Sequence, residues 1–298
     1  MRKDLKRHQL VFGGFGSGKT AYVKNILNET SFNYVILDQK NEYLAFEKNM
    51  SDVYCSLNTP KNVPEYIWFS VLSEIFCETF GLGQRASMIL NRVLEGMSNG
   101  KVEIDFRSLL EVLEREFEKR NERMNYRMPF SEQENYHVLR QKFASWVRKP
   151  TETILQQKNE TNRLDLEVLR TDEKSFLMKL CAARLFFERK YNANQNDPII
   201  LVVEDAELLF PKEQKKDVLH IHESVLETMV REGRNYQMYC IFVTSNEQGI
   251  SQIIKDNLYK RKFVGRSEPM LDVDTVKIIF ETVTLSLPCK ATIAFLSA

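Results

Sequence analysis

The sequence predicts an α/β fold with a mainly parallel sheet and a large helical insertion. Short runs rich in β-branched and aromatic residues are separated by stretches with helical spacing, and strands that alternate with helices form parallel sheets. A long central interval instead repeats its apolar residues every three or four positions, as helices do. These observations divide the chain into a core of residues 1–50 and 197–298 and a helical insertion of residues 51–196.

The expected elements follow in chain order. Residues 8–12 form an apolar run that ends in glycines, and residues 19–27 then show helical spacing, which indicates a strand, a loop and a helix. Residues 33–37 predict a second buried strand that ends at Asp38. Within the insertion, apolar residues at positions 67, 71, 75 and 76 share one helical face. Further strands are predicted at 198–203, 239–243 and, more weakly, 262–264, with a last edge strand at 292–296.

Composition narrows the class of protein without naming a partner. The chain has 298 residues, of which 43% are hydrophobic and 28% charged, as in ordinary soluble domains. Its net charge of +1 gives no overall attraction to a polyanion, so composition neither supports nor excludes DNA. The five cysteines form no C-x-x-C pair, which predicts reduced thiols and a cytoplasmic location. No apolar stretch approaches the roughly 20 residues that span a bilayer, so no membrane segment is expected.

A glycine-rich segment between the first strand and the first helix carries the strongest motif. Residues 13–20 satisfy G-x-x-x-x-G-K-[ST], the pattern of a loop whose N–H groups converge on phosphate. Lys19 is placed to reach the β- and γ-phosphates of ATP, and Thr20 is placed to bind Mg²⁺. A chance glycine-rich turn is the alternative, but the flanking strand and helix disfavour it. The predicted cofactor-binding residues of this loop are Gly13, Gly14, Phe15, Gly16, Ser17, Gly18, Lys19, Thr20 and Ala21.

Acidic residues follow the strand predicted at 198–203. An ATPase with a phosphate-binding loop needs one acidic residue to hold the Mg²⁺ shell and usually a second to polarise the attacking water. We expect Glu204 to serve the metal and Asp205 to act as base, although spacing alone does not fix which residue takes which role. The alternative is a pair of solvated acids at a strand end.

Three further residues are candidates for catalysis. Asn246 follows the strand at 239–243, at the carboxyl edge of the sheet, where a polar side chain can sense the γ-phosphate. Arg231 and Arg234 precede that strand, and they are either solvated cations at a helix end or arginine fingers that reach phosphate across a subunit boundary.

Other chemistries find no support in the sequence. His220 and His222 are spaced i, i+2, which places them on different faces of a helix, and no H-E-x-x-H or Cys/His cluster occurs. There is no G-x-S-x-G elbow either. The charge-dense segment 114–127 alternates its signs, as a solvated helix face does.

Taken in order, the motifs resemble the HerA/FtsK superfamily of P-loop motors, and its HerA side in particular. The likeness lies in residues 8–20, in D-Q-K-N-E-Y at 38–43, in V-V-E-D-A-E at 202–207 and in R-E-G-R-N-Y at 231–236. HerA-like proteins show D-P-K-G-E-Y, an acidic pair followed by Ala-His, and R-E-G-R-K at these places. Here Gln39 replaces Pro and Asn41 replaces Gly, Asp205 and Glu207 stand where Glu and His are usual, and Asn246 replaces Gln. HerA proteins also carry an N-terminal barrel before the cradle, whereas here the cradle begins at residue 13.

The resemblance implies a RecA-like P-loop NTPase core that assembles into a homo-hexameric ring. It implies ATP and Mg²⁺ bound between subunits, an arginine supplied in trans, and double-stranded DNA threaded through the pore. It also implies that Asp38, Lys40 and Glu42 lie at the nucleotide or subunit edge. A viral packaging, mobile-element or defence-associated role with a partner nuclease or other effector protein fits such a stripped core.

The primary hypothesis is therefore an ATP-dependent DNA translocase of HerA type. One alternative is a nucleotide-gated assembly or signalling ATPase that binds nucleotide to switch a partner and never moves DNA. A second alternative is a monomeric P-loop kinase, which also has a cradle and a helical lid but leaves the block at 38–43 unexplained.

Overall fold

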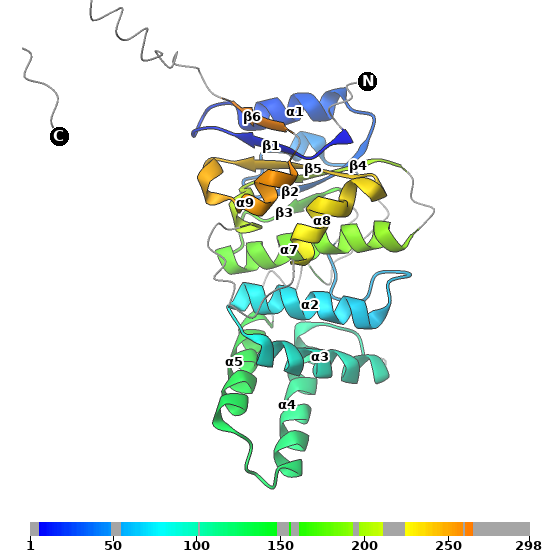
Figure 1. Ribbon diagram of the computed structural model, residues 1–298, viewed down its shortest axis with the longest axis vertical. Helices are drawn as coiled ribbons and strands as arrows, with labels where there is room; N and C mark the ends of the chain where they lie inside the picture. Colours follow the sequence, from blue (N-terminus) through cyan, green and yellow to red (C-terminus); the bar gives the residue numbers. More distant parts are fainter. Residues whose placement is uncertain are drawn as a thin grey trace, which may run out of the picture. The chain divides into compact units, whose positions relative to one another are not determined.

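A six-stranded, all-parallel sheet with the strand order β3-β2-β4-β5-β1-β6 is the centre of the molecule (Figure 1). The computed structural model describes residues 6–48, 55–100, 102–147, 155, 161–192, 197–210, 224–258 and 260–264. The strands are β1 Gln9–Phe12, β2 Asn33–Asp38, β3 Arg163–Asp165, β4 Ile199–Val203, β5 Met238–Thr244 and β6 Lys260–Phe263. The α-helices are α1 Lys19–Glu29, α2 Glu65–Phe80, α3 Gln84–Asn99, α4 Phe106–Arg123, α5 Phe130–Trp146, α7 Thr171–Tyr191, α8 Val225–Glu232 and α9 Gln252–Asn257. Short 3-10 turns are η2 Leu44–Phe46, η3 Ala206–Leu208, η4 Gly233–Tyr236 and η5 Glu247–Gly249.

The central strands are apolar on both faces because helices cover both sides of the sheet. Successive residues of a strand point to opposite faces, so Ile36 joins one hydrophobic cluster while Val35 and Leu37 join the other. Helix α1 covers the first face with Val23, Ile26 and Leu27. On the opposite face lie α7 and α8, as Figure 1 shows. This arrangement confirms the predicted α/β fold with a parallel sheet.

Beyond α7 lies the helical part of the chain. Helix α2 packs on α7, α3 packs on α2, and α4 and α5 form a hairpin that packs on α3. An aromatic cluster joins four of these helices: its rings, with centroids 4.9 to 6.3 Å apart, belong to Phe76, Phe106, Phe143, Trp146 and Phe176. The same hydrophobic cluster continues to the sheet through Leu37 and Leu201, so the helices and this sheet face share one core.

Strand β3 lies inside the interval 51–196, which the sequence predicted to be helical. Its three residues pair in parallel with Ile36 to Asp38 of β2 and form one edge of the sheet. The segment is short and carries a polar residue at each end, so its side-chain pattern gave little strand signal. The division into a core of 1–50 and 197–298 and an insertion of 51–196 stays a prediction, although β3, which lies within 51–196, pairs with the core sheet.

Some expectations fall outside the described residues. The edge strand at 292–296 lies there, as do His220 and His222. All six strands that the structure does describe belong to the compact unit that ends at Val264.

Candidate functional site

The loop between β1 and α1 has the backbone of a phosphate cradle. Gly16 and Gly18 have φ of 71° and 91°, in the left-handed region that favours glycine. Gly13 also has a positive φ, of 156°, and in addition a Cβ there would lie 1.9 Å from the carbonyl oxygen of Val264. The amide of Val264 donates to the carbonyl of Phe12 at 2.7 Å, which fixes the chain after β6 against the start of the loop.

Charged and polar groups of the cradle contact one another. The Lys19 ammonium donates to the carbonyl oxygens of Gly13 and Gly14, both at 2.8 Å. The Ser17 hydroxyl is buried and has no hydrogen-bond partner among the described residues. A buried hydroxyl without a hydrogen-bond partner costs free energy, and a phosphate oxygen bound in this loop could accept the missing hydrogen bond. The residues present therefore fit a bound nucleotide phosphate.

Two oxygen-bearing side chains, those of Thr20 and Glu42, lie together at the start of α1. The Thr20 hydroxyl donates to the Glu42 carboxylate at 2.5 Å, which places two oxygen ligands of the type that Mg²⁺ prefers side by side. No cluster of three or more His, Cys, Asp or Glu side chains suited to a metal occurs among the described residues. Thr20 and Glu42 offer two oxygens, and Mg²⁺ commonly takes one or two protein oxygens and completes its shell with phosphate and water, so the two residues fit such an ion. Such an ion would supply charge for the phosphates at this point.

The end of β4 presents the predicted acidic pair in two different environments. Glu204 is buried, and its carboxylate accepts a hydrogen bond from the Tyr43 hydroxyl. Burial raises the pKa of Glu204 to about 7, and the Tyr43 hydrogen bond opposes that rise because it favours the ionised carboxylate. Glu204 is thus poised to gain or lose a proton near neutral pH.

Asp205, the next residue, is half-buried and adopts φ of 46°. This left-handed conformation turns the chain sharply after β4 and leads it into η3. Its carboxylate forms an ion pair of 3.2 Å with the Lys40 ammonium. The Asp205 charge raises the pKa of Lys40 against the opposing effect of burial, the largest single cause acting on that lysine, so Lys40 stays charged. The Asp205 carboxylate, which the sequence predicted to act as base, is thus held in a fixed orientation and already has an ionic partner.

The block at 38–43 links these groups. The Asp38 carboxylate is fully buried and accepts the backbone N–H groups of Lys40, Glu42 and Tyr43 at 3.0 to 3.2 Å. Asp38 thereby folds the loop so that Glu42 faces Thr20 and Tyr43 faces Glu204. The predicted contacts of Asp38, Lys40 and Glu42 with nucleotide or a second subunit stay predictions. The Asp38 side chain is buried and forms hydrogen bonds within the loop.

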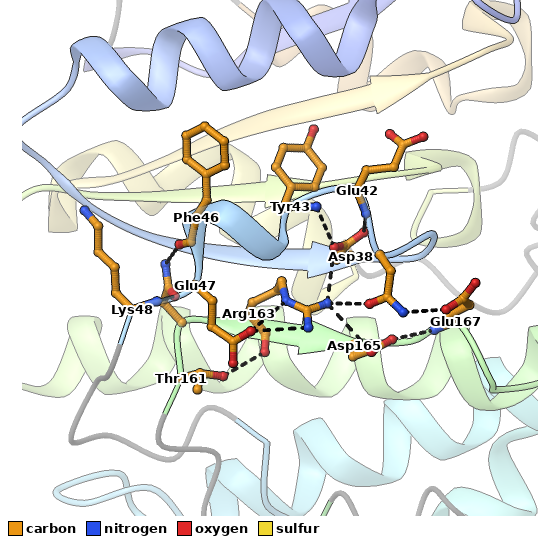
Figure 2. Close-up of polar contacts among 12 residues, drawn as sticks. Asp38, Glu42, Tyr43, Phe46, Glu47, Lys48, Thr161, Arg163, Asp165 and Glu167 are labelled. Atoms are coloured by element: carbon orange, nitrogen blue, oxygen red, sulfur yellow. Dashed lines mark hydrogen bonds and ion pairs between the residues drawn. The ribbon is translucent and has the colours of Figure 1, made fainter.

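Sequence analysis missed Arg163, which Figure 2 shows among the carboxylates around this loop. Its guanidinium is 7% exposed and contacts Asp38 and Glu47, each at 3.3 Å, and Asn41 at 2.7 Å. The contacts join β3 to residues more than 110 positions earlier in the chain. Only the alternation of polar Arg163 and Asp165 with apolar Leu164 and Leu166 hinted at a strand here.

Asn246 and the two arginines lie at opposite ends of strand β5, Asn246 after its carboxyl end and the arginines before its amino end. Phe12, which leads into the cradle, pairs with Thr244, so Asn246 follows β5 on the cradle side. Its side chain accepts the N–H of Gln248 at 3.0 Å and caps η5. Arg231 ends α8 and Arg234 lies in η4, both before β5 begins.

The length of β5 separates the arginines from the cradle of their own chain. Its seven residues span roughly 20 Å, farther than one side chain reaches. Arg231 pairs with Glu232 at 3.0 Å. Arg234 is exposed, and no ion pair involves it within the part of the chain that the structure describes. Burial, aided by the Arg234 charge, lowers the pKa of nearby His8 to about 4, so that histidine is neutral at pH 7.

These elements define the class of the protein: a P-loop NTPase with a RecA-like sheet, whose cradle, acidic pair and loop 38–43 meet at the carboxyl edge. The family model of the central domain of helicase HerA matches residues 1–185. The chain belongs to this family, which confirms the likeness seen in its motifs.

One solved structure supports the fold, and a second is similar over most of the chain at a lower score. The bacterial conjugative coupling protein TrwBΔN70, in its unbound monoclinic form, aligns over 86% of this chain and 68% of its own, with 11% identity and a TM-score of 0.55. The genome packaging NTPase B204 from Sulfolobus turreted icosahedral virus 2, in complex with ATPγS, aligns over 94% of this chain and 84% of its own, with 12% identity and a TM-score of 0.39. No curated protein matches the chain in sequence. None of the described helices is both long and apolar enough to cross a membrane.

Proposed function

We propose that this protein is an ATP-dependent DNA translocase of HerA type that hydrolyses ATP between the subunits of a homo-hexameric ring. The observation that carries the proposal is the separation of the cradle from Arg231 and Arg234 by the length of β5. In a single chain these arginines cannot reach the phosphates held by Lys19. In a head-to-tail ring, the arginine edge of one subunit faces the cradle edge of the next, and each interface then holds a complete site.

Each residue then has a definite task. Lys19 leaves the carbonyls of its own loop and neutralises the β- and γ-phosphates, while Thr20 and Glu42 hold Mg²⁺ beside them. Glu204, with Tyr43 as its hydrogen-bond donor, would help to hold the ion through its water shell. Asp205 accepts the proton of the attacking water, Lys40 fixes its direction, and Asn246 senses the γ-phosphate. The arginine of the neighbouring subunit stabilises the charge that spreads over the γ-phosphate oxygens.

Subunit mixing tests the shared site. Arg234→Ala should bind ATP normally yet hydrolyse it on the order of 10³-fold more slowly, because only the transition state needs the arginine. Arg231→Ala is made in parallel, and Arg140→Ala serves as the control, since Arg140 lies on the exposed face of α5. Lys19→Ala should lose tight ATP binding. Mixing it with the arginine variant should restore part of the activity, because some interfaces then combine an intact cradle with an intact arginine.

A nucleotide-gated assembly ATPase is the second candidate. The ion pair between Lys40 and Asp205 favours it, because a base that is already paired is poorly free to activate water. Stimulation of hydrolysis by duplex DNA separates the two functions. A translocase should turn over ATP faster with DNA, whereas a gated assembly should change its mass with ATP and ignore DNA. A monomer whose hydrolysis neither arginine variant slows would instead indicate a P-loop kinase.

A further inference from the structure

Strand β3 holds the loop of residues 38–48 at both of its ends. At the far end, the Asn162 side chain accepts the N–H of Lys48 at 2.6 Å and donates to the carbonyl of Phe46 at 3.2 Å. At the near end, Arg163 contacts Asp38 and Asn41. Figure 2 shows Arg163 at the centre, with dashed lines to Asp38, Glu47 and Asp165. The loop between the two ends therefore has little freedom to move away from the sheet.

Arg163 is the centre of this arrangement. One Nη1 atom lies 2.7 Å from Asn41 Oδ1 and 3.3 Å from Asp38 Oδ2, while Nε and Nη2 both lie 3.3 Å from Glu47 Oε2. A guanidinium stays charged at every accessible pH, so its burial here depends on these acceptors. The planar fork also fixes their relative positions, which a lysine would not do equally well.

Asp38 links Arg163 to the part of the loop that lies at the nucleotide site. The Asp38 carboxylate that meets Arg163 also accepts the N–H groups of Glu42 and Tyr43. Those two residues are the ones whose side chains reach Thr20 and Glu204. The Asp38 carboxylate thus connects Arg163 with Glu42, which contacts Thr20, and with Tyr43, which contacts Glu204.

Asn41 adds a second connection. Its φ of 55° is a left-handed conformation that glycine adopts at no cost, so the backbone does not require a side chain at this position. The side chain nevertheless accepts from Arg163 at 2.7 Å and donates to the Glu167 carboxylate. Asn41 therefore bridges the loop to the residues that follow β3.

We propose that Arg163 and Asn41 are positioning residues that hold Glu42 and Tyr43 in place for Mg²⁺-nucleotide binding. The inference rests on the nucleotide site of the proposed function but requires neither a ring nor DNA. Residues that orient metal ligands typically change metal affinity 10- to 100-fold when they are removed. Arg163 contacts three side chains of the loop, and Asn41 provides only one of these contacts. Replacing Arg163 should therefore have the larger effect.

Binding of a fluorescent ATP analogue, with Mg²⁺ and then with EDTA, tests the proposal on the full chain. In Arg163→Met the affinity gained from Mg²⁺ should fall about 10- to 100-fold, and in Asn41→Gly about 3- to 10-fold, while affinity in EDTA stays within about twofold of wild type. Arg163→Lys should recover part of the loss, because it restores the charge without the fork. A merely structural role would weaken binding equally in both conditions.

Matched controls make the comparison specific. Asn125→Gly is the same substitution at another left-handed asparagine, with φ of 48°, at the tip of the α4–α5 hairpin. Arg140→Met removes an exposed arginine that pairs with Glu114. Both should leave the Mg²⁺ gain unchanged. If Arg163→Met fails to fold by circular dichroism, Asn41→Gly decides the question, because glycine suits that backbone.

Two results would overturn different parts of the reasoning. If wild type gains affinity from Mg²⁺ and Asn41→Gly and a folded Arg163→Met gain as much, the positioning role is wrong and the nucleotide site stands. If wild type binds the analogue equally well with Mg²⁺ and with EDTA, the metal site itself is wrong, and the positioning role falls with it. A wild type that passes this test yet ignores DNA would contradict only the translocase.

Discussion

Replacing Gly13 with alanine tests how the cradle is attached to the end of the sheet. The added Cβ would lie 1.9 Å from the carbonyl oxygen of Val264, and that oxygen would have to retreat by about 1.5 Å to reach ordinary contact. The obstacle is backbone rather than a flexible side chain, so the hydrogen bond between the Val264 amide and the Phe12 carbonyl would be disturbed. A lost hydrogen bond of about 1 kcal/mol and backbone strain of about 1–3 kcal/mol sum to a destabilisation of roughly 2–4 kcal/mol.

Thermal unfolding of the nucleotide-free protein measures this effect. For a chain of this size, the Gly13→Ala variant should melt roughly 5–10 °C below wild type. Gly14→Ala is the matched control, because a Cβ on Gly14 meets no atom within 4 Å. It should melt within about 2 °C of wild type. Equal melting temperatures for the two variants would refute the close approach of residue 264 to the cradle.

Buried polar and aromatic groups give three further predictions. Burial raises the pKa of Glu74 to about 7, so its contribution to stability is present below pH 4.5 and is lost as pH rises through 7. At pH 8.5 the Glu74→Gln variant should therefore melt at a higher temperature than wild type, with a free energy of unfolding greater by at most about 3 kcal/mol. Near pH 5 this advantage should disappear. Tyr43→Phe removes a hydrogen-bond donor that lowers the pKa of Glu204. The pH below which Mg²⁺-ATP binding is lost should therefore rise by about one unit. An unchanged pH dependence of binding would contradict that hydrogen bond. Phe76→Ala, in the aromatic cluster, should cost about 3–5 kcal/mol in urea unfolding, and a cost below about 1 kcal/mol would disprove its place in the core.

Local signals allowed much of the fold to be predicted. The cradle at 13–20 is contiguous, and its glycines, lysine and threonine have fixed spacing, so its position followed from the sequence. The strands at 33–37, 198–203 and 239–243 were found because helices cover both of their faces, which makes nearly every residue apolar; the exposed Asn33 at the start of β2 is an exception. Glu204 was assigned from its place at a strand end, and the structure brings it to Tyr43.

Non-local contacts account for what was missed. Strand β3 has three residues, and its pairing depends on β2, more than 120 positions earlier in the chain. Arg163 carries no motif, because its role arises from acceptors on a distant loop. The conformation of Asp205 was equally hidden, since φ of 46° for an aspartate reflects the turn into η3 rather than a local preference.

The position of β1 in the sheet has a consequence during synthesis on the ribosome. This strand emerges first, yet its neighbours are β5 and β6, whose residues 238–244 and 260–263 are made near the end of the described chain. At roughly 5–20 residues per second, more than ten seconds pass before Leu10 and Val11 find their partners. A nascent chain therefore exposes an unpaired apolar strand until β5 has been made, and a truncated product that stops before β5 never completes the cradle. Only chains that extend through β5 and β6 should be able to retain nucleotide.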